Sequence, residues 1–174
     1  MVPCGKVRGR ESNLVYLIGL VVFVLDQVIK WIVASHVAVD TGFPILHGVL
    51  EILYVRNTGA AFSLLTNQRI ILVVIAVIVV MIVIFVDRKF AIGKLSLQIP
   101  LGMLLGGAVG NLFDRVVHGY VIDYVYVQAI HFPVFNLADS AIVVAMILLV
   151  IRSWKTPGTE VLNKGGDDHE SKTS

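Results

Sequence analysis

Two aspartates in apolar surroundings are the residues of this chain best suited to chemistry. Asp123 lies in "GYVIDYVYV" and Asp139 in "FNLADSAI". Two carboxyl groups brought together at low dielectric cannot both ionise easily and tend to share a proton. One can then act as general base on a water molecule and the other as general acid toward a carbonyl oxygen. Such a pair hydrolyses an amide without a metal or a covalent intermediate.

Each aspartate also has a simpler interpretation. Asp123 could be an exposed residue of a short extracytoplasmic segment, the usual place of a lone aspartate. Asp139 follows Asn136 by three residues and could be a first-turn carboxylate of a helix capped by Asn136. Spacing alone does not show that Asp123 and Asp139 meet.

The sequence offers no competing catalytic or metal-binding motif. It has no HExxH, no CxxC and no serine nucleophile motif, and its five histidines have no ligand-like spacing. Cys4 is the only cysteine, so no disulfide framework is expected. We therefore expect neither a metal nor a cofactor.

The composition is that of a membrane protein. Hydrophobic residues make up 57% of the chain and charged residues 15%, which excludes an ordinary water-soluble domain. Four apolar segments are long enough to cross the hydrocarbon core: 14–34, 70–86, 95–112 and 134–151. The first could instead be a cleaved signal peptide, but Asp26 and Lys30 interrupt it before the candidate cleavage site.

The distribution of Lys and Arg predicts the orientation of the spans. The side with more positive charge in its short flanks stays in the cytoplasm. That side carries Lys6, Arg8, Arg10, Arg88, Lys89, Lys94, Arg152 and Lys155, and the other carries Arg56, Arg69 and Arg115. Both termini are therefore predicted to be cytoplasmic. The chain divides into an N-terminal segment (1–13), a four-helix domain (14–153) and a polar, Gly-rich tail (154–174) that we expect to be disordered.

Charged residues within the first span need partners or a function. Asp26 and Lys30 are spaced i, i+4, so they share a helix face and can form an ion pair. Alternatively, the two neutralise each other and Lys30 extends to the outer interface. That alternative explains Asp26 less well, because a short carboxylate cannot reach far.

The third span combines a packing surface with polar residues at its outer end. Asn111 and Arg115 share a face at i, i+4, and Asp114 is interpreted as an interfacial charge. A stripe of small residues lets a neighbouring helix approach closely; it consists of Gly102, Gly106 and Gly110.

The connection after the first span has β character. Residues 48–55 are β-branched and partly alternating, which predicts a short strand or two, and Gly59 with Ala60 and Ala61 permits a tight turn. An ordinary surface loop is the alternative. The apolar stretch around Asp123 leads back into the membrane and is predicted to lie along the interface.

Four motifs together resemble a known family. "LDQVIKW", "VRNTGAAFSLL", "GGAVGNLFDRVVHGYVIDYV" and "FPVFNLADSAI", in this order on a four-span chain, resemble the bacterial lipoprotein signal peptidases, also called prolipoprotein signal peptidase or signal peptidase II. The resemblance covers 14–152. Tyr124 stands where many members have Phe, a difference interpreted as conservative.

The resemblance implies a fold, a reaction and a set of site residues. The fold is an all-α membrane protein of four helices, with a small extracytoplasmic β-containing loop between the first two and a short interfacial segment between the last two. The reaction is that of an aspartic endopeptidase that cleaves diacylglyceryl-modified prolipoproteins just before the lipid-modified Cys. Asp123 and Asp139 are its catalytic pair, and the other site residues are Asp26, Lys30, Asn57, Asn111, Arg115 and Asn136.

The resemblance also assigns roles and a location. Asn57 and Arg115 would bind the substrate chain or its lipid, and the other four would orient the catalytic pair. The implied partners are the lipidated precursors and membrane lipids, with no nucleic acid. The implied location is the bacterial cytoplasmic (inner) membrane, as a multi-pass protein with its active site on the extracytoplasmic side.

Two other classes of function compete with the enzyme. The first is a non-enzymatic carrier subunit in which Asp26 and Asp139 form a proton relay. The second is a purely structural scaffold of small helices. Only the enzyme requires a pair of aspartates on the outer side.

Overall fold

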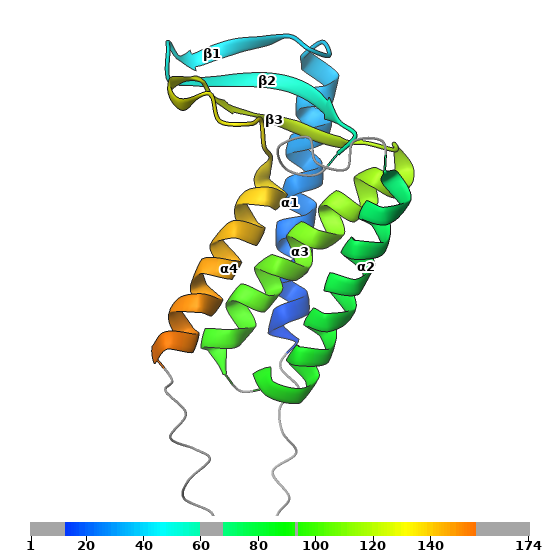
Figure 1. Cartoon of the computed structure of the whole chain (residues 1–174), viewed down its shortest axis with the longest axis vertical. Coiled ribbons are helices and arrows are strands. Elements are labelled where there is room, and N and C mark those ends of the chain that lie inside the picture. Colours follow the sequence, from blue (N-terminus) through cyan, green and yellow to red (C-terminus); the bar gives the residue numbers. More distant parts are fainter. Residues whose placement is uncertain (1–12, 60–67, 93, 156–174) are drawn as a thin grey trace, which may run out of the picture.

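Four long helices and a three-stranded sheet make up the computed structural model (Figure 1). It describes residues 13–59, 68–92 and 94–155, so the predicted disordered tail beyond Lys155, Cys4 and the Ala60 and Ala61 part of the turn lie outside the described residues. The elements are α1 (Leu14–His36), β1 (Gly42–Leu46), β2 (Leu50–Asn57), α2 (Arg69–Val86), a π-helical turn η2 (Asp87–Ala91), α3 (Leu95–Val117), β3 (Val121–Val127), a 3₁₀ turn η3 (Gln128–Ile130) and α4 (Leu137–Lys155).

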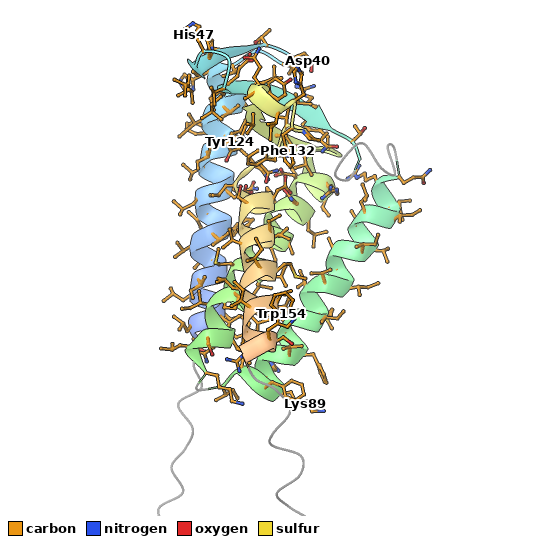
Figure 2. The ribbon with its side chains drawn as sticks, turned by 60° about the vertical axis from the view of Figure 1, so that its left-hand side comes forward. Asp40, His47, Lys89, Tyr124, Phe132 and Trp154 are labelled. Atoms are coloured by element: carbon orange, nitrogen blue, oxygen red, sulfur yellow. The ribbon has the colours of Figure 1, made fainter. Side chains whose placement is uncertain are left out.

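All four predicted spans are helices of membrane-crossing length and hydropathy: Leu14–His36, Arg69–Ala91, Leu95–Val117 and Leu137–Trp154. Their aliphatic side chains project outward from the bundle (Figure 2). Leu17, Ile75 and Ile147 are examples of large apolar side chains at the surface, as expected for helices surrounded by lipid. The prediction of four spans is confirmed, whereas their orientation in the membrane stays a prediction.

Helix α3 lies at the centre of the bundle, between α1, α2 and α4 (Figure 1). The predicted small-residue stripe forms its contact with α1. A Cβ at Gly106 would lie 2.5 Å from the carbonyl oxygen of Gly19, and one at Gly102 would lie 2.7 Å from Cβ of Ile18. The two backbones are therefore too close for any side chain at these positions, and the packing role of the stripe is confirmed.

The sheet covers one end of the bundle, opposite the end where α1 begins and α4 stops (Figure 1). Its strands are antiparallel in the order β1-β2-β3. One face packs on the C-terminal end of α1 through a buried apolar cluster: Val33, Tyr54, Ile122 and Tyr124.

Strand β3 corrects the predicted fold in one respect. Residues 121–127 were predicted as a short interfacial segment outside the β-containing loop. They form a strand that pairs with β2, with Asp123 opposite Val55, and their place at the membrane interface stays a prediction. The run of Val, Ile and Tyr favours a strand, and β2 supplies the hydrogen-bonding partner. The β structure therefore combines the first and third connections of the chain.

Candidate active site

Asp123 lies in the middle of β3 and is almost completely buried. Two side-chain amides hold its carboxyl group: Nδ2 of Asn57 donates to Oδ2 at 2.8 Å, and Nδ2 of Asn136 donates to Oδ1 at 2.7 Å. The strand register brings Asn57 here, because β2 and β3 are adjacent and Val55 is the partner of Asp123. The two hydrogen bonds therefore fix the orientation of the Asp123 carboxyl group.

Asp139 lies in the first turn of α4 and is half-buried. Asn136 caps this helix as predicted, because its Oδ1 accepts the backbone N–H of Asp139 at 2.9 Å. In return, Oδ2 of Asp139 accepts the N–H of Asn136 at 3.3 Å, a reciprocal arrangement of the capping-box kind. Its other oxygen, Oδ1, accepts Nδ2 of Asn111 at 2.7 Å.

Asn136 and Asn111 connect the two aspartates. Asn136 bonds to Asp123 through its side chain and to Asp139 through its backbone, and its Nδ2 lies 3.2 Å from Oδ1 of Asn111. Burial, followed by the negative charge of Asp139, raises the pKa of Asp123 to about 7. The hydrogen bonds from Asn57 and Asn136 oppose this rise because they favour the carboxylate. The pKa of Asp123 is therefore raised in the direction expected for a buried carboxyl group next to a second carboxylate.

Both aspartates line one large cavity of about 1070 Å³. Its polar wall also includes Asn57, Asn111 and Arg115. Its lining also has an apolar part, which includes Phe132, Phe135, Ile142 and Val143. Such a cavity suits a substrate with both a peptide backbone and long apolar groups. Among the described residues no cluster of His, Cys, Asp and Glu could hold a metal ion.

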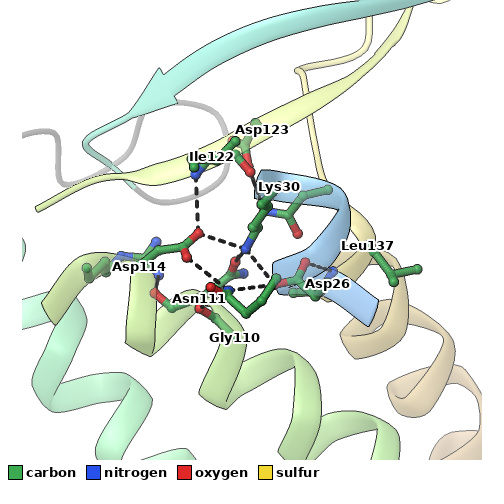
Figure 3. A network of polar contacts seen from close by, with 12 residues as sticks. Asp26, Lys30, Gly110, Asn111, Asp114, Ile122, Asp123 and Leu137 are labelled. Carbon is green, nitrogen blue, oxygen red and sulfur yellow. Dashed lines mark hydrogen bonds and ion pairs between the residues drawn. The ribbon is translucent and has the colours of Figure 1, made fainter. Parts of the chain in front are cut away.

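An ionic network between α1 and α3 adjoins the site (Figure 3). The ammonium of Lys30 bridges Oδ2 of Asp26 and Oδ2 of Asp114, each at 2.8 Å, and donates to Oδ1 of Asn111 at 3.0 Å. The predicted pair of Asp26 and Lys30 is confirmed. The alternative in which Lys30 extends to the interface is wrong, because Lys30 is only 1% exposed. Its charge instead stabilises two carboxylates and orients Asn111.

Comparison with known proteins identifies this arrangement. The family model for signal peptidase (SPase) II matches residues 18–155. The chain belongs to the signal peptidase II family. A lipoprotein signal peptidase from Bacillus velezensis (strain DSM 23117 / BGSC 10A6 / LMG 26770 / FZB42) is 40% identical over 140 residues, which cover 79% of this chain and 92% of that protein.

Two solved structures share the fold of this signal peptidase II family member. A bacterial membrane enzyme solved by the in meso method at 2.3 Å resolution has a TM-score of 0.78 and 30% identity, over 90% of this chain and 94% of that one. A second, at 1.9 Å, has a TM-score of 0.76 and 31% identity, over 84% and 96%. The predicted family, aspartic-peptidase class and role in lipoprotein maturation are confirmed, and the proton carrier and the structural scaffold are wrong.

Asp114 is the charged residue of this peptidase that the sequence interpretation misplaced. It was expected to be an interfacial charge, but it is fully buried between Lys30 and the sheet. Its Oδ2 also accepts the backbone N–H of Ile122 at 3.3 Å, so it fixes β3 next to Asp123. Gln27 is a further site residue that the sequence analysis does not predict: its amide donates to both Asp114 at 3.0 Å and Asp26 at 3.2 Å. The i, i+3 spacing of Asn111 and Asp114 was the available signal, since it places both on one helix side.

Asn57, at the end of β2, and Arg115, near the end of α3, both bond to the backbone of Gly59. Oδ1 of Asn57 accepts the N–H of Gly59 at 2.8 Å, so this residue supports both a turn and Asp123. Arg115 donates to the carbonyl oxygens of Asn111 at 3.2 Å and Gly59 at 3.0 Å. Both line the cavity, and their contact with substrate stays a prediction.

Proposed function

We propose that Asp123 and Asp139 are the catalytic pair of this peptidase, which cleaves diacylglyceryl-modified prolipoproteins just before the lipid-modified Cys. One observation carries the assignment: the two carboxyl groups line a single cavity and share Asn136 as a hydrogen-bonding partner. The raised pKa of Asp123 supports it further, because the charge of Asp139 is one of its causes.

The geometry suits the addition of water to a peptide carbonyl group. Asp123, with a pKa of about 7, is the member that keeps a proton, and it donates this proton to the carbonyl oxygen. Asp139 is less buried and takes a proton from the attacking water, which adds to the carbonyl carbon. The tetrahedral intermediate then collapses, the C–N bond breaks, and Asp139 returns its proton to the departing amine. Asp123 recovers its own proton as the new carboxyl group forms.

The remaining site residues hold this pair in place. Asn57 and Asn136 direct the oxygens of Asp123, and Asn111 directs Asp139. Asp26 and Lys30 support the pair indirectly through Asn111, because Lys30 bonds to Asn111 and to Asp26. Arg115 and the apolar cavity wall are left to bind the peptide and the acyl chains of the substrate. Such fixed supports are what precise positioning of catalytic groups requires.

The surroundings of the site favour a particular placement in the cell. We infer a multi-pass protein of the bacterial cytoplasmic membrane, with both termini cytoplasmic and the sheet and catalytic pair on the extracytoplasmic side. The excess of Lys and Arg at the end opposite the sheet supports this orientation. Residues 14–153 would then form the peptidase domain, and 1–13 and 154–174 would be cytoplasmic segments.

Single substitutions of the two aspartates test the assignment. Asp123→Asn and Asp139→Asn should each lower the rate of cleavage of a diacylglyceryl-modified precursor by about a thousandfold or more, because each removes one proton-transfer group. Cleavage is measured with purified protein in detergent, as the appearance of the shortened lipoprotein. Asp40→Asn is the matched control, because Asp40 is exposed just before β1 and does not line the cavity, so this change should leave the rate unchanged (Figure 2).

Two results would overturn the proposal. The first is cleavage at a near wild-type rate by a folded Asp123→Asn or Asp139→Asn protein. The second is equally fast cleavage of a precursor without the diacylglyceryl group, which would leave the pair in place but remove the proposed substrate class.

A further inference from the structure

The N-terminus of α4, which carries Asp139, is held by three different parts of the chain. The first three residues of α4 each donate their backbone N–H to a separate side chain. Leu137 donates to the hydroxyl of Tyr124 at 3.1 Å, Ala138 to Oδ1 of Asp26 at 3.0 Å, and Asp139 to Oδ1 of Asn136 at 2.9 Å. The acceptors come from β3, from α1 and from the helix cap itself.

These contacts are needed because the first N–H groups of a helix have no partner within it. At a buried position an unpaired N–H is costly, so the helix start must lie where acceptors exist. Two of the acceptors, Asp26 and Tyr124, lie on other elements and so fix the helix start relative to α1 and β3. Asp26 and Asn136 belong to the polar network already described, whereas Tyr124 was interpreted as a mere equivalent of Phe.

We propose that Tyr124 is a positioning residue, whose hydroxyl group sets the location of Asp139 relative to Asp123. Tyr124 directly follows Asp123 on β3, so a bond from its hydroxyl to Leu137 connects the strand of one aspartate to the helix of the other. The proposal rests on the proposed catalytic pair, because it concerns the geometry of those two residues.

The surroundings of Tyr124 suit a fixed support. Its ring is buried with Val33, Tyr54 and Ile122 between the sheet and α1 (Figure 2). Burial raises the pKa of its phenol to about 12, so the hydroxyl stays neutral at any physiological pH. Phe at this position would keep the ring packing and remove only the acceptor for Leu137. Tyr and Phe are therefore not equivalent in this chain.

The test compares Tyr124→Phe with Tyr126→Phe. Tyr126 lies two residues further along β3, on the same face of the sheet and away from the helix start, so it controls for the loss of a hydroxyl group. Steady-state cleavage of the diacylglyceryl-modified precursor gives kcat and KM, and thermal unfolding in the same detergent confirms the fold. We expect Tyr124→Phe to lower kcat about tenfold with KM changed less than twofold. Tyr126→Phe should match the wild type.

Amide hydrogen exchange provides a second measurement that does not depend on activity. The Leu137 amide should be protected in the wild type as well as that of Ala138, and it should exchange faster in Tyr124→Phe while Ala138 changes less. A Leu137 amide that exchanges freely in the wild type would overturn the proposal even if the variant failed to fold. A kcat within twofold of the wild type in Tyr124→Phe would also overturn it. Because the wild-type rate and the Asp123→Asn result are measured separately, either outcome leaves the proposed function intact.

Discussion

The two ends of the helix bundle differ in whether their buried polar groups have hydrogen-bonding partners. At the end under the sheet, six buried polar side chains bond to one another or to backbone groups: Asp26, Lys30, Asn111, Asp114, Asp123 and Asn136. At the other end, an apolar cluster of Val15, Val83, Ala91, Leu101 and Leu105 forms the core. The buried side chains of Asp87 and Gln98 lie toward that end, and Oδ1 of Asp87 and Nε2 of Gln98 have no hydrogen-bonding partner among the described residues.

The difference shows where polar structure serves a function. A network of charges in the interior is a poor way to gain stability, because desolvation offsets most of the attraction. Under the sheet, however, a chain of contacts leads to the proposed catalytic pair: Lys30 bonds to Asn111, and Asn111 bonds to Asp139. The apolar end needs only close packing and tolerates imperfect polar contacts. Substitutions at matched positions of the two ends can test this contrast.

Substitution of a lysine should give the largest difference between the two ends in the free energy of unfolding. Lys30→Met leaves the carboxylates of Asp26 and Asp114 buried without their common cation, so we expect a loss of about 3–5 kcal/mol in the free energy of unfolding. The control at the opposite end is Lys89→Met, which removes only exposed contacts with Phe85 and Phe90 and should cost less than about 1 kcal/mol. Unfolding in detergent micelles measures both. Similar losses in the two variants would contradict the contrast.

Alanine in the glycine stripe should have a smaller and more selective effect. A Cβ at Gly110 would lie 2.6 Å from Oδ2 of Asp26, and one at Gly102 would lie 2.9 Å from the carbonyl oxygen of Val15. Each substitution should cost about 1–3 kcal/mol because neighbouring atoms must move. Only Gly110→Ala should also lower kcat, since it displaces the network behind the catalytic pair. If Gly102→Ala lowered kcat equally, the two ends would be mechanically coupled, contrary to this account.

Glutamine substitution should change the free energy of unfolding least, and less at Gln98 than at Gln27. Gln27→Met removes a donor to Asp26 and Asp114 and should cost about 1–2 kcal/mol. Gln98→Met removes a buried amide whose nitrogen has no partner, so stability should stay within about 1 kcal/mol or rise. The same unfolding assay applies, and a larger loss for Gln98→Met than for Gln27→Met would refute this interpretation.

Patterns local in sequence predicted much of this molecule. The four spans follow from long apolar runs, the pair of Asp26 and Lys30 from i, i+4 spacing, and the Asn136 cap from its place before an apolar helix. The motifs shared with the family then pointed to the same site residues.

Residues whose role depends on a distant partner were missed. Asp114 resembled an interfacial charge because its burial is set by Lys30 on another helix. Residues 121–127 form a strand because β2 lies alongside, and the hydroxyl of Tyr124 matters only because α4 begins next to it. Spacing within one segment can show which residues share a face, but it does not identify their partners on other segments. The alternation of β-branched and aromatic residues in "VIDYVYV" did offer a signal for the strand.

The ionisation of Asp123 tests the central claim most directly. Infrared spectroscopy can follow its protonated carboxyl band against pH, with Asp123→Asn used to assign the band. We expect the band to be half lost near pH 7 in the wild type, because burial and the charge of Asp139 both oppose ionisation. In Asp139→Asn the midpoint should move to lower pH but stay above the ordinary value of 3.8, because burial remains. A wild-type midpoint near 3.8, or one unchanged by Asp139→Asn, would contradict a coupled catalytic pair.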